Sequence, residues 1–177
     1  MSIFRGLVCL SLACWGSAMA QDKVDILFLM DTSGSMMDDI SAMSDAMTRF
    51  VLELEDNDLK WQAMAVTQDD GCNNTGIVSV IDSTDPIADL SDGLFGLGGV
   101  DAERLLTVAV SAVDADAPGD CNEGFLRDDS LLHIIMVSDE PEQSADGWRD
   151  LIKDVVDVKG DPTLVRYSAI AGPPGGC

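Results

Sequence analysis

The chain has 177 residues, of which 32 are acidic and 10 are basic, so its formal charge is −22. This charge excludes nucleic acid as a partner, because a phosphate backbone requires a basic surface, and it disfavours anionic lipid surfaces. Apolar residues make up 46% of the chain, which is enough for the core of one domain of ordinary size. Cations are the natural partners of so acidic a chain, although solubility or adaptation to salt is the simpler explanation of the acidity.

Residues 1–20 have the pattern of a secretory signal peptide. Arg5 supplies a basic start, an apolar stretch follows over 7–15, and Ala-Met-Ala at 18–20 fits the small-x-small cleavage pattern. The apolar stretch is too short to cross a bilayer, and no other segment is long and apolar enough for a membrane helix.

Cleavage after this signal leaves residues 21–177 as one domain. The charge of this mature chain is −23, from 32 acidic and 9 basic residues, because one arginine is removed. We therefore expect an exported protein, secreted or periplasmic. Cys14 raises a lipid-anchored cell-surface protein as the less favoured alternative, because the apolar stretch before it is very short.

Beyond the signal peptide, apolar runs of strand length alternate with apolar residues at helical spacing. The run over 24–30 (VDILFLM) is typical of a strand buried on both faces of a parallel sheet. Apolar residues three and four apart over 36–55 indicate an amphipathic helix. In chain order, we predict strands over 24–30, 61–67, 76–81, 131–137 and 164–170, and helices over 36–55, 101–113 and 148–158.

This alternation predicts an α/β fold, a Rossmann-like, doubly wound, mostly parallel sheet with helices on both faces. Segments 68–76 and 82–100 are rich in Gly and Asp, and we predict them to be surface loops. Sites in such sheets lie at the carboxyl ends of the strands. Two predicted strands end in polar residues there, the first at Asp31 and the fourth at Ser138 and Asp139.

The motif Asp31-x-Ser33-x-Ser35 lies between the first predicted strand and the first predicted helix. One carboxylate and two hydroxyls are hard oxygen donors, which suit Mg²⁺ or Mn²⁺ better than metals that prefer thiolates. Asp139, at the end of a neighbouring strand, would supply a second carboxylate. The alternative is helix capping by Ser33 or Ser35, with Asp31 accepting loop amides. The setting at the ends of two buried strands favours the metal site.

At these residues the chain resembles the von Willebrand factor type A family. VDILFLMDTSGSM is similar to that family's first strand and metal-ion-dependent adhesion site, and LLHIIMVSDE is similar to its fourth strand with the last metal aspartate. The resemblance covers roughly residues 23–172, and GFLRDDSLLHIIMVSDE and YSAIAGPPGG further resemble a bacterial secreted branch. It implies a Rossmann-like sheet with a divalent cation at its top edge, where an acidic group of a partner completes the coordination.

The chain departs from this family in two places. The family commonly has a threonine ligand after two glycines in a second loop, but Val100, which has no donor, follows 98–99 here. The bacterial branch implies Glu103 as the replacement, with Asp101 as its rival; the alternative for both is an ordinary acid at a helix N-terminus. The family also usually has one more strand and a final helix after residue 172, so this chain is either a fragment or has a sheet with a bare edge.

Three cysteines remain after signal cleavage. A bridge between two of them is expected in an oxidising compartment. Cys72 and Cys121 both lie in segments rich in Gly, Asn and Asp, so we predict that they pair. Cys177 would then have a free thiol, an intermolecular bridge or a partner beyond the end of this sequence.

The expected function is therefore that of an exported binding module and not of an enzyme. Its cation, Mg²⁺ or Mn²⁺ with Ca²⁺ as an alternative, would bind a protein or another acidic ligand. A metal-dependent hydrolase and an acidic calcium-binding structural protein are the alternatives. The only histidine, His133, lies in a predicted buried strand, so no general base other than carboxylates is evident near the metal. The predicted metal ligands are Asp31, Ser33, Ser35, Glu103 and Asp139.

Overall fold

A computed structural model describes residues 22–95 and 104–172. Within them, five strands form one sheet in the order β3-β2-β1-β4-β5. Every neighbouring pair is parallel except β2 and β3. The strands are β1 (Lys23–Met30), β2 (Lys60–Val66), β3 (Val78–Ser79), β4 (Leu131–Ser138) and β5 (Val165–Ala171).

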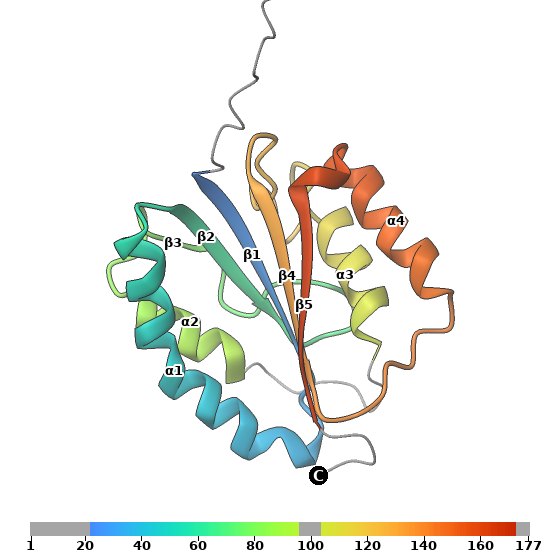
Figure 1. Cartoon of the computed structure of the whole chain (residues 1–177), viewed down its shortest axis with the longest axis horizontal. Helices are drawn as coiled ribbons and strands as arrows, with labels where there is room; N and C mark the ends of the chain where they lie inside the picture. Colours follow the sequence, from blue (N-terminus) through green and yellow to red (C-terminus); the bar gives the residue numbers. More distant parts are fainter. Residues whose placement is uncertain (1–21, 96–103, 173–177) are drawn as a thin grey trace, which may run out of the picture.

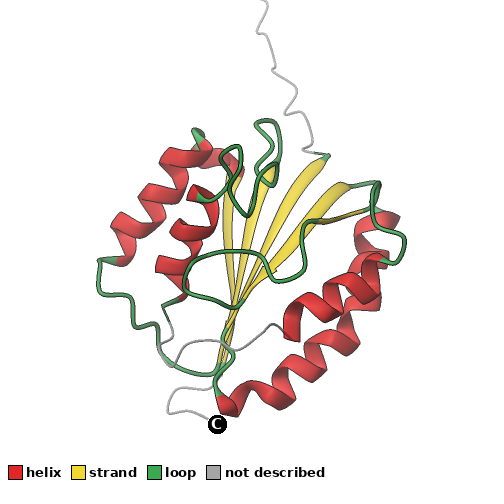
Figure 2. Cartoon of the chain, turned by 180° about the vertical axis from the view of Figure 1, so that it is seen from behind, coloured by secondary structure: helices red, strands yellow, loops and turns green. Residues whose placement is uncertain are grey.

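Helices cover both faces of this sheet (Figures 1 and 2). Helices α1 and α2 pack with one side of the sheet, and α3 and α4 pack with the other. The predicted fold class, an α/β doubly wound sheet, is confirmed. The helices are α1 (Met37–Asp56), α2 (Pro86–Phe95), α3 (Leu105–Asp114) and α4 (Trp148–Lys159), with short 3-10 turns at Gly34–Met36 and Pro162–Leu164.

The central strand β1 explains why the first apolar run is nearly continuous. Its side chains alternate between the two helical layers, so both sets are buried. Ile26, Phe28 and Met30 belong to the core under α1 and α2. Leu27 and Leu29 belong to the core under α3 and α4. Two separate apolar cores therefore hold β1 in the middle of the sheet.

Helix α2 corrects one prediction, because segment 82–100 was expected to be a loop. Leu90 and Leu94 lie one turn apart on α2 and are buried. Gly93 has a packing role, since a Cβ at that position would lie 3.3 Å from the Ala65 Cβ on β2. The abundance of Gly and Asp suggested a loop, but here the glycine lets a helix approach the sheet closely.

The carboxyl ends of three neighbouring strands meet at one edge of the sheet. Met30 at the end of β1 lies opposite Val137 of β4. Ser138 at the end of β4 lies opposite Ala171 of β5. The residues that follow β1 and β4 are therefore brought together by the parallel register, at the position where sheets of this kind place their sites.

Candidate metal-binding site

Asp31 directly follows β1, and only 4% of its surface is exposed. Its backbone N–H donates to the Val137 carbonyl of β4 at 2.9 Å. Its Oδ1 accepts from the Ser33 N–H at 2.8 Å, and its Oδ2 accepts from the Ser138 hydroxyl at 2.7 Å. These bonds fix the carboxylate where β1 and β4 end. Each carboxylate oxygen retains a second lone pair, with which it can bind a cation.

The side chains of Ser33, Ser35 and Asp139 form a chain of close contacts beside Asp31. The two serine hydroxyl oxygens are 3.1 Å apart, and the Ser35 hydroxyl donates to Asp139 Oδ1 at 3.3 Å. The serines lie where the chain turns from β1 into α1, and the buried side chain of Met36 anchors this turn in the core. The structure thus brings together four of the five predicted metal ligands.

Helix capping does not account for the two serines. Ser33 precedes the 3-10 turn that leads into α1, and its side chain makes no capping hydrogen bond. The hydrogen bonds of the Ser33 and Ser35 hydroxyls are to each other and to Asp139. Asp31 does accept the loop amide of Ser33, as the capping alternative required, but only through Oδ1. The hydroxyls are therefore directed at one another and not at helix amides.

The spacing of these oxygens suits a small divalent cation. Octahedral Mg²⁺ with ligands at about 2.1 Å places adjacent ligand oxygens about 3.0 Å apart. The separations of 3.1 and 3.3 Å among Ser33, Ser35 and Asp139 are close to that value. No group of three or more His, Cys, Asp or Glu side chains with the arrangement of a metal site occurs within 22–95 and 104–172. A cation here would therefore depend on serine hydroxyls and water as well as on two carboxylates.

No basic side chain balances the charge of this site in the described parts of the chain. The ion pairs there involve neither Asp31 nor Asp139. The hydrogen-bond donors to Asp31 are a backbone amide and a hydroxyl, both neutral. A buried carboxylate without a counter-charge is costly, so the site has the electrostatic character of an acceptor for a cation.

Ser138 is a residue of this site to which sequence analysis gave no role. Its hydroxyl donates to Asp31 and accepts from the Glu140 N–H at 3.0 Å. Its carbonyl accepts from the Gly172 N–H at 3.2 Å. The polar cluster at the end of β4 indicated this residue, but the parallel pairing with β1 is needed to show that its hydroxyl meets Asp31.

The loop that carries Asp139 is also attached to the start of α3. Glu142 accepts from the Leu106 backbone N–H at 3.2 Å. The Ser144 hydroxyl oxygen lies 3.1 Å from the Thr107 backbone nitrogen and 2.9 Å from its hydroxyl. Both side chains satisfy amides that a helix N-terminus leaves free. No local sequence pattern reveals this role of Glu142, because the helix that it caps lies 36 residues earlier in the chain.

The structure does not describe the loop that was predicted to supply a further metal ligand. Val100, Asp101 and the predicted ligand Glu103 lie outside the described ranges. Arg104 lies immediately before α3, and its side chain forms an ion pair with Asp69, which follows β2. The assignment of Glu103 as a metal ligand therefore stays a prediction.

A disulfide joins Cys72 and Cys121, the pair expected from the sequence, with their Cα atoms 5.5 Å apart. It connects the loop after β2 to the loop after α3. Asn122 is fully buried next to it, and its side-chain amide donates to the carbonyls of Gly71 and Ala112 at 2.8 and 2.9 Å. A Cβ at Gly71, whose φ is +78°, would lie 2.4 Å from the Ala112 nitrogen, so only glycine lets the loop pack directly on α3.

His133 is too far from the candidate site to act there as a base. It lies on β4 five residues before Ser138, which corresponds to roughly 16 Å along a strand. Its Nε2 lies 2.9 Å from the Ser168 hydroxyl of β5. Partial burial, together with the positive charge of Arg166, lowers the pKa of its imidazole below the usual value.

The predicted signal peptide, residues 1–20, and Cys177 are outside the described residues. Between residues 22 and 172, the described helices include none with the length and apolar character that a membrane crossing requires.

Comparison with known proteins gives a likeness of fold and no family. No protein-family model matches the sequence, and no curated protein matches it. Among solved structures, proximal thread matrix protein 1 from the mussel byssus is similar over 85% of this chain, with 15% sequence identity and a TM-score of 0.49. This chain spans 38% of the length of that protein. At this identity, the likeness concerns the fold alone.

Proposed function

We propose that this chain is an exported binding module of the von Willebrand factor A type, whose divalent cation captures an acidic group of a protein or other ligand. The observation that carries the proposal is the convergence of Asp31, Ser33, Ser35 and Asp139 at the ends of β1 and β4. The four side chains come from positions that match the family's motif. Mg²⁺ or Mn²⁺ fits the donor set best, with Ca²⁺ as the alternative if more waters are retained.

The charge of the site supports a cation that remains able to bind a further ligand. Asp31 and Asp139 together balance a divalent ion, and the serine hydroxyls add oxygen donors without adding charge. These four side chains do not complete an octahedron, so positions remain for water or for a carboxylate of a partner. We propose that Glu103 occupies one of these positions, directly or through water. A third carboxylate would leave a net charge of −1 and weaken the capture of acidic ligands.

Binding is favoured over hydrolysis by the neighbourhood of Asp31. A metal-dependent hydrolase needs a group that moves a proton beside the metal-bound water. Within 22–95 and 104–172, the side chains that hydrogen-bond to Asp31 and Asp139 are serines, which are poor bases at neutral pH. We therefore propose that the cation holds a ligand and does not activate water.

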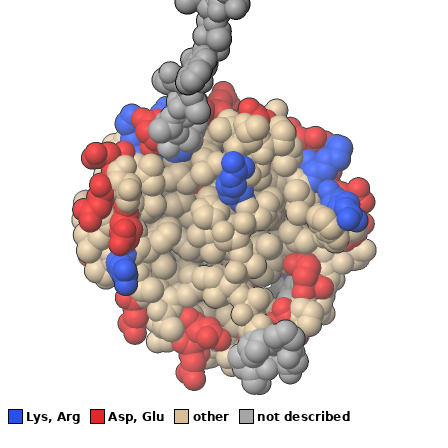
Figure 3. Space-filling model, viewed as in Figure 1, with Lys and Arg blue, Asp and Glu red and all other residues tan. Residues whose placement is uncertain are grey.

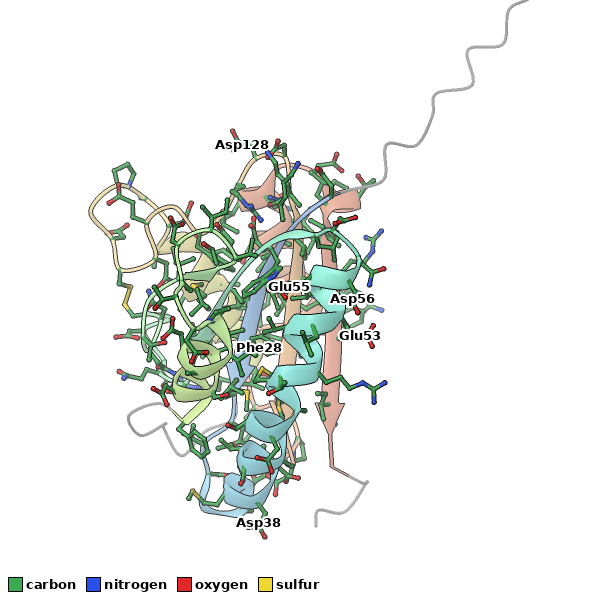
Figure 4. All side chains as sticks on the ribbon, turned by 90° about the vertical axis from the view of Figure 1, so that its left-hand side faces the viewer. Phe28, Asp38, Glu53, Glu55, Asp56 and Asp128 are labelled. Atoms are coloured by element: carbon green, nitrogen blue, oxygen red, sulfur yellow. A yellow bond between two sulfur atoms is a disulfide. The ribbon has the colours of Figure 1, made fainter. Side chains whose placement is uncertain are left out.

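Calorimetry with Mg²⁺ and Mn²⁺ tests the metal site directly. The parent protein should bind one cation, and Asp31→Ala should abolish this binding while the circular dichroism spectrum is retained. Asp128→Ala is a matched control, because it removes an aspartate that Figure 4 places at the opposite end of the molecule from the start of α1. Unchanged Mn²⁺ affinity in Asp31→Ala would disprove the site.

A further inference from the structure

A groove of about 420 Å³ lies between α1 and the carboxyl ends of β4 and β5. Its walls come from one face of α1, on which residues three and four apart line up, and from the strand ends. It adjoins the candidate metal site, because Ser138 and Asp139 line both. The lining residues are Met36, Asp39, Ala42, Met43, Ala46, Val137, Ser138, Asp139, Ile170, Ala171 and Gly172.

The lining of this groove is apolar along its length and acidic at two positions. Methionine, alanine, valine and isoleucine side chains supply the apolar surface, and Ile170 keeps 54% of its surface exposed. Asp39 and Asp139 supply the charge, and no Lys or Arg lines the groove. Within the described residues, no ion pair includes Asp39. The groove thus combines an apolar channel with an unbalanced carboxylate.

The surface around the groove is also mostly uncharged, but it carries basic as well as acidic side chains. Figure 3 shows the face on which α1 lies at the left, α4 at the right and β5 between them. Most of the middle of this face is uncharged, apart from one Lys or Arg group above its centre. Asp and Glu side chains lie toward the rim, together with further Lys and Arg side chains. With a formal charge of −22, the whole protein attracts basic partners over long range and repels acidic ones.

We infer that this groove is a docking site for the side chain of a lysine or arginine on a basic protein partner. These side chains have an apolar stem and a charged end, which is the pattern of the groove. The stem would lie against Met43 and Ala46, and the charged end would reach Asp39. A second copy of this chain fits poorly, because it would bring an equal negative charge to the same surface. An anionic membrane is disfavoured for the same reason.

This inference does not rest on the proposed cation. Asp139 belongs to both places, and a cation bound there would neutralise it, whereas Asp39 would stay available to the partner. The partner's acidic group on the cation and its basic side chain in the groove would then lie close together on the partner. A partner segment with one acidic residue close to a lysine or arginine would satisfy both. Cation binding and groove binding can be measured separately.

The first experiment follows amide chemical shifts during titration with N-acetyl-arginine methylamide, and with N-acetyl-norleucine methylamide as the uncharged probe. Both titrations are run in Mg²⁺ and in EDTA at low salt. The arginine probe should shift the amides of Asp39, Ala46 and Ile170. It should bind roughly tenfold more tightly than norleucine, because a charge-assisted hydrogen bond contributes about one power of ten. Equal affinities, or shifts spread over the whole acidic surface, would overturn the inference.

Matched charge variants separate the groove from general attraction to an acidic protein. Asp39→Asn should remove the preference for arginine, whereas Asp38→Asn should keep it. Asp38 is an exposed aspartate in the same turn of α1 but does not line the groove. Mn²⁺ affinity should be unchanged in both variants, so a failed metal site and a failed groove give different results. Equal effects of the two variants would show simple charge attraction and refute the groove.

Filling the groove provides a test that leaves the charge unchanged. Ala46→Trp should abolish binding of both probes, and Thr48→Trp, exposed on the same helix outside the groove, should not. Sedimentation of the parent protein at increasing concentration tests whether a second copy of this chain occupies the groove. Self-association that Ala46→Trp abolishes would assign the groove to a second copy of the chain and reject the basic partner. Continued probe binding in Ala46→Trp would reject the groove itself.

Discussion

The two ends of β1 each hold a buried aspartate, and the two differ in what surrounds the charge. Asp25 at the amino end is fully buried and accepts from the Arg127 side chain at 2.7 Å and from its backbone N–H at 3.0 Å. The Ser130 hydroxyl also donates to it, and the Lys159 ammonium lies 3.9 Å away. Asp31 at the carboxyl end is almost as buried but has only neutral donors among the described residues.

This difference distinguishes a structural carboxylate from one that awaits a ligand. Arg127 also donates to the carbonyls of Val24 and Lys60, so the amino end of the sheet is a closed network of charges and hydrogen bonds. The carboxyl end has hydroxyls that bond to one another, and its two carboxylates, Asp31 and Asp139, form no ion pair with any residue that the structure describes. Both ends lie on the same strand and in the same fold. Only the carboxyl end has unbalanced charge with which to bind a cation.

The largest effect should come from breaking the amino end. Asp25→Asn removes the carboxylate and leaves Arg127 and the buried Lys159 without their negative partner. Removing one member of a buried ion pair costs about 3–5 kcal/mol of unfolding free energy. Urea denaturation followed by circular dichroism measures this loss. A loss below about 1 kcal/mol would show that the network contributes little, and Asp22→Asn, in an exposed ion pair with Lys60, is the control.

The same substitution at the carboxyl end should behave differently. In EDTA, Asp31→Asn should leave the unfolding free energy unchanged within about 1 kcal/mol, or raise it, because the charge removed has no ionic partner. In Mg²⁺ at about 100 times its dissociation constant, the parent should gain about 2.7 kcal/mol that the variant lacks. Denaturation in the two buffers tests both statements. A large loss of unfolding free energy for Asp31→Asn in EDTA would show that Asp31, like Asp25, stabilises the fold without a metal.

Ser138 should affect the cation and not the fold. Ser138→Ala removes the hydroxyl that donates to Asp31 at 2.7 Å, and loss of such an orienting partner typically weakens metal binding 10–100-fold. Ser138→Thr keeps a hydroxyl and should restore most of the affinity. Mn²⁺ binding measured by electron paramagnetic resonance gives both values. Equal affinities in the alanine and threonine variants would show that the hydroxyl does not position Asp31.

The two ends of β1 also differ in how far they could be predicted from the sequence. The predicted strand over 24–30 became β1, and the polar residues after it became the candidate site, because apolar periodicity and position at a strand end are local signals. Asp25 lies inside that apolar run, and its partner Arg127 is 102 residues away. No local pattern reveals such a pairing, so the network at the amino end was not predicted.

The third predicted strand is shorter in the structure, because side-chain hydrogen bonds compete with its pairing in the sheet. Segment 76–81 was predicted as a strand, but only Val78 and Ser79 pair with β2, in antiparallel orientation. The Ser79 hydroxyl oxygen accepts from the Asp82 N–H, and the Ser79 N–H donates to the Ser83 hydroxyl oxygen. These side-chain bonds turn the backbone away from the sheet. The β-branched residues of 76–81 favour a strand, and the serine hydroxyls end it.

The smallest effect should come from His133, which lies between the two ends on β4. Partial burial and the nearby Arg166 lower its pKa in the folded protein, so the folded protein takes up this proton at a lower pH than the unfolded chain does. As the pH falls through the unfolded value of about 6.5, the unfolded chain binds more protons, and the free energy of unfolding decreases. The decrease due to His133 ends below its folded pKa, where both states are protonated.

His133→Gln tests this sign, because glutamine keeps a polar group near the Ser168 hydroxyl and does not titrate. Unfolding free energies of the parent and the variant should be compared by urea denaturation between about pH 7.5 and pH 5.5, around the ordinary histidine pKa. The parent should lose more stability than the variant as the pH falls, since only the parent carries the histidine. Carboxylate titration contributes equally to both proteins and cancels in the difference. A parent that gains stability relative to the variant toward low pH would mean that the folded protein favours the imidazolium. That result would place a negative partner near His133 and would extend the balanced charge of the amino end toward the middle of the sheet.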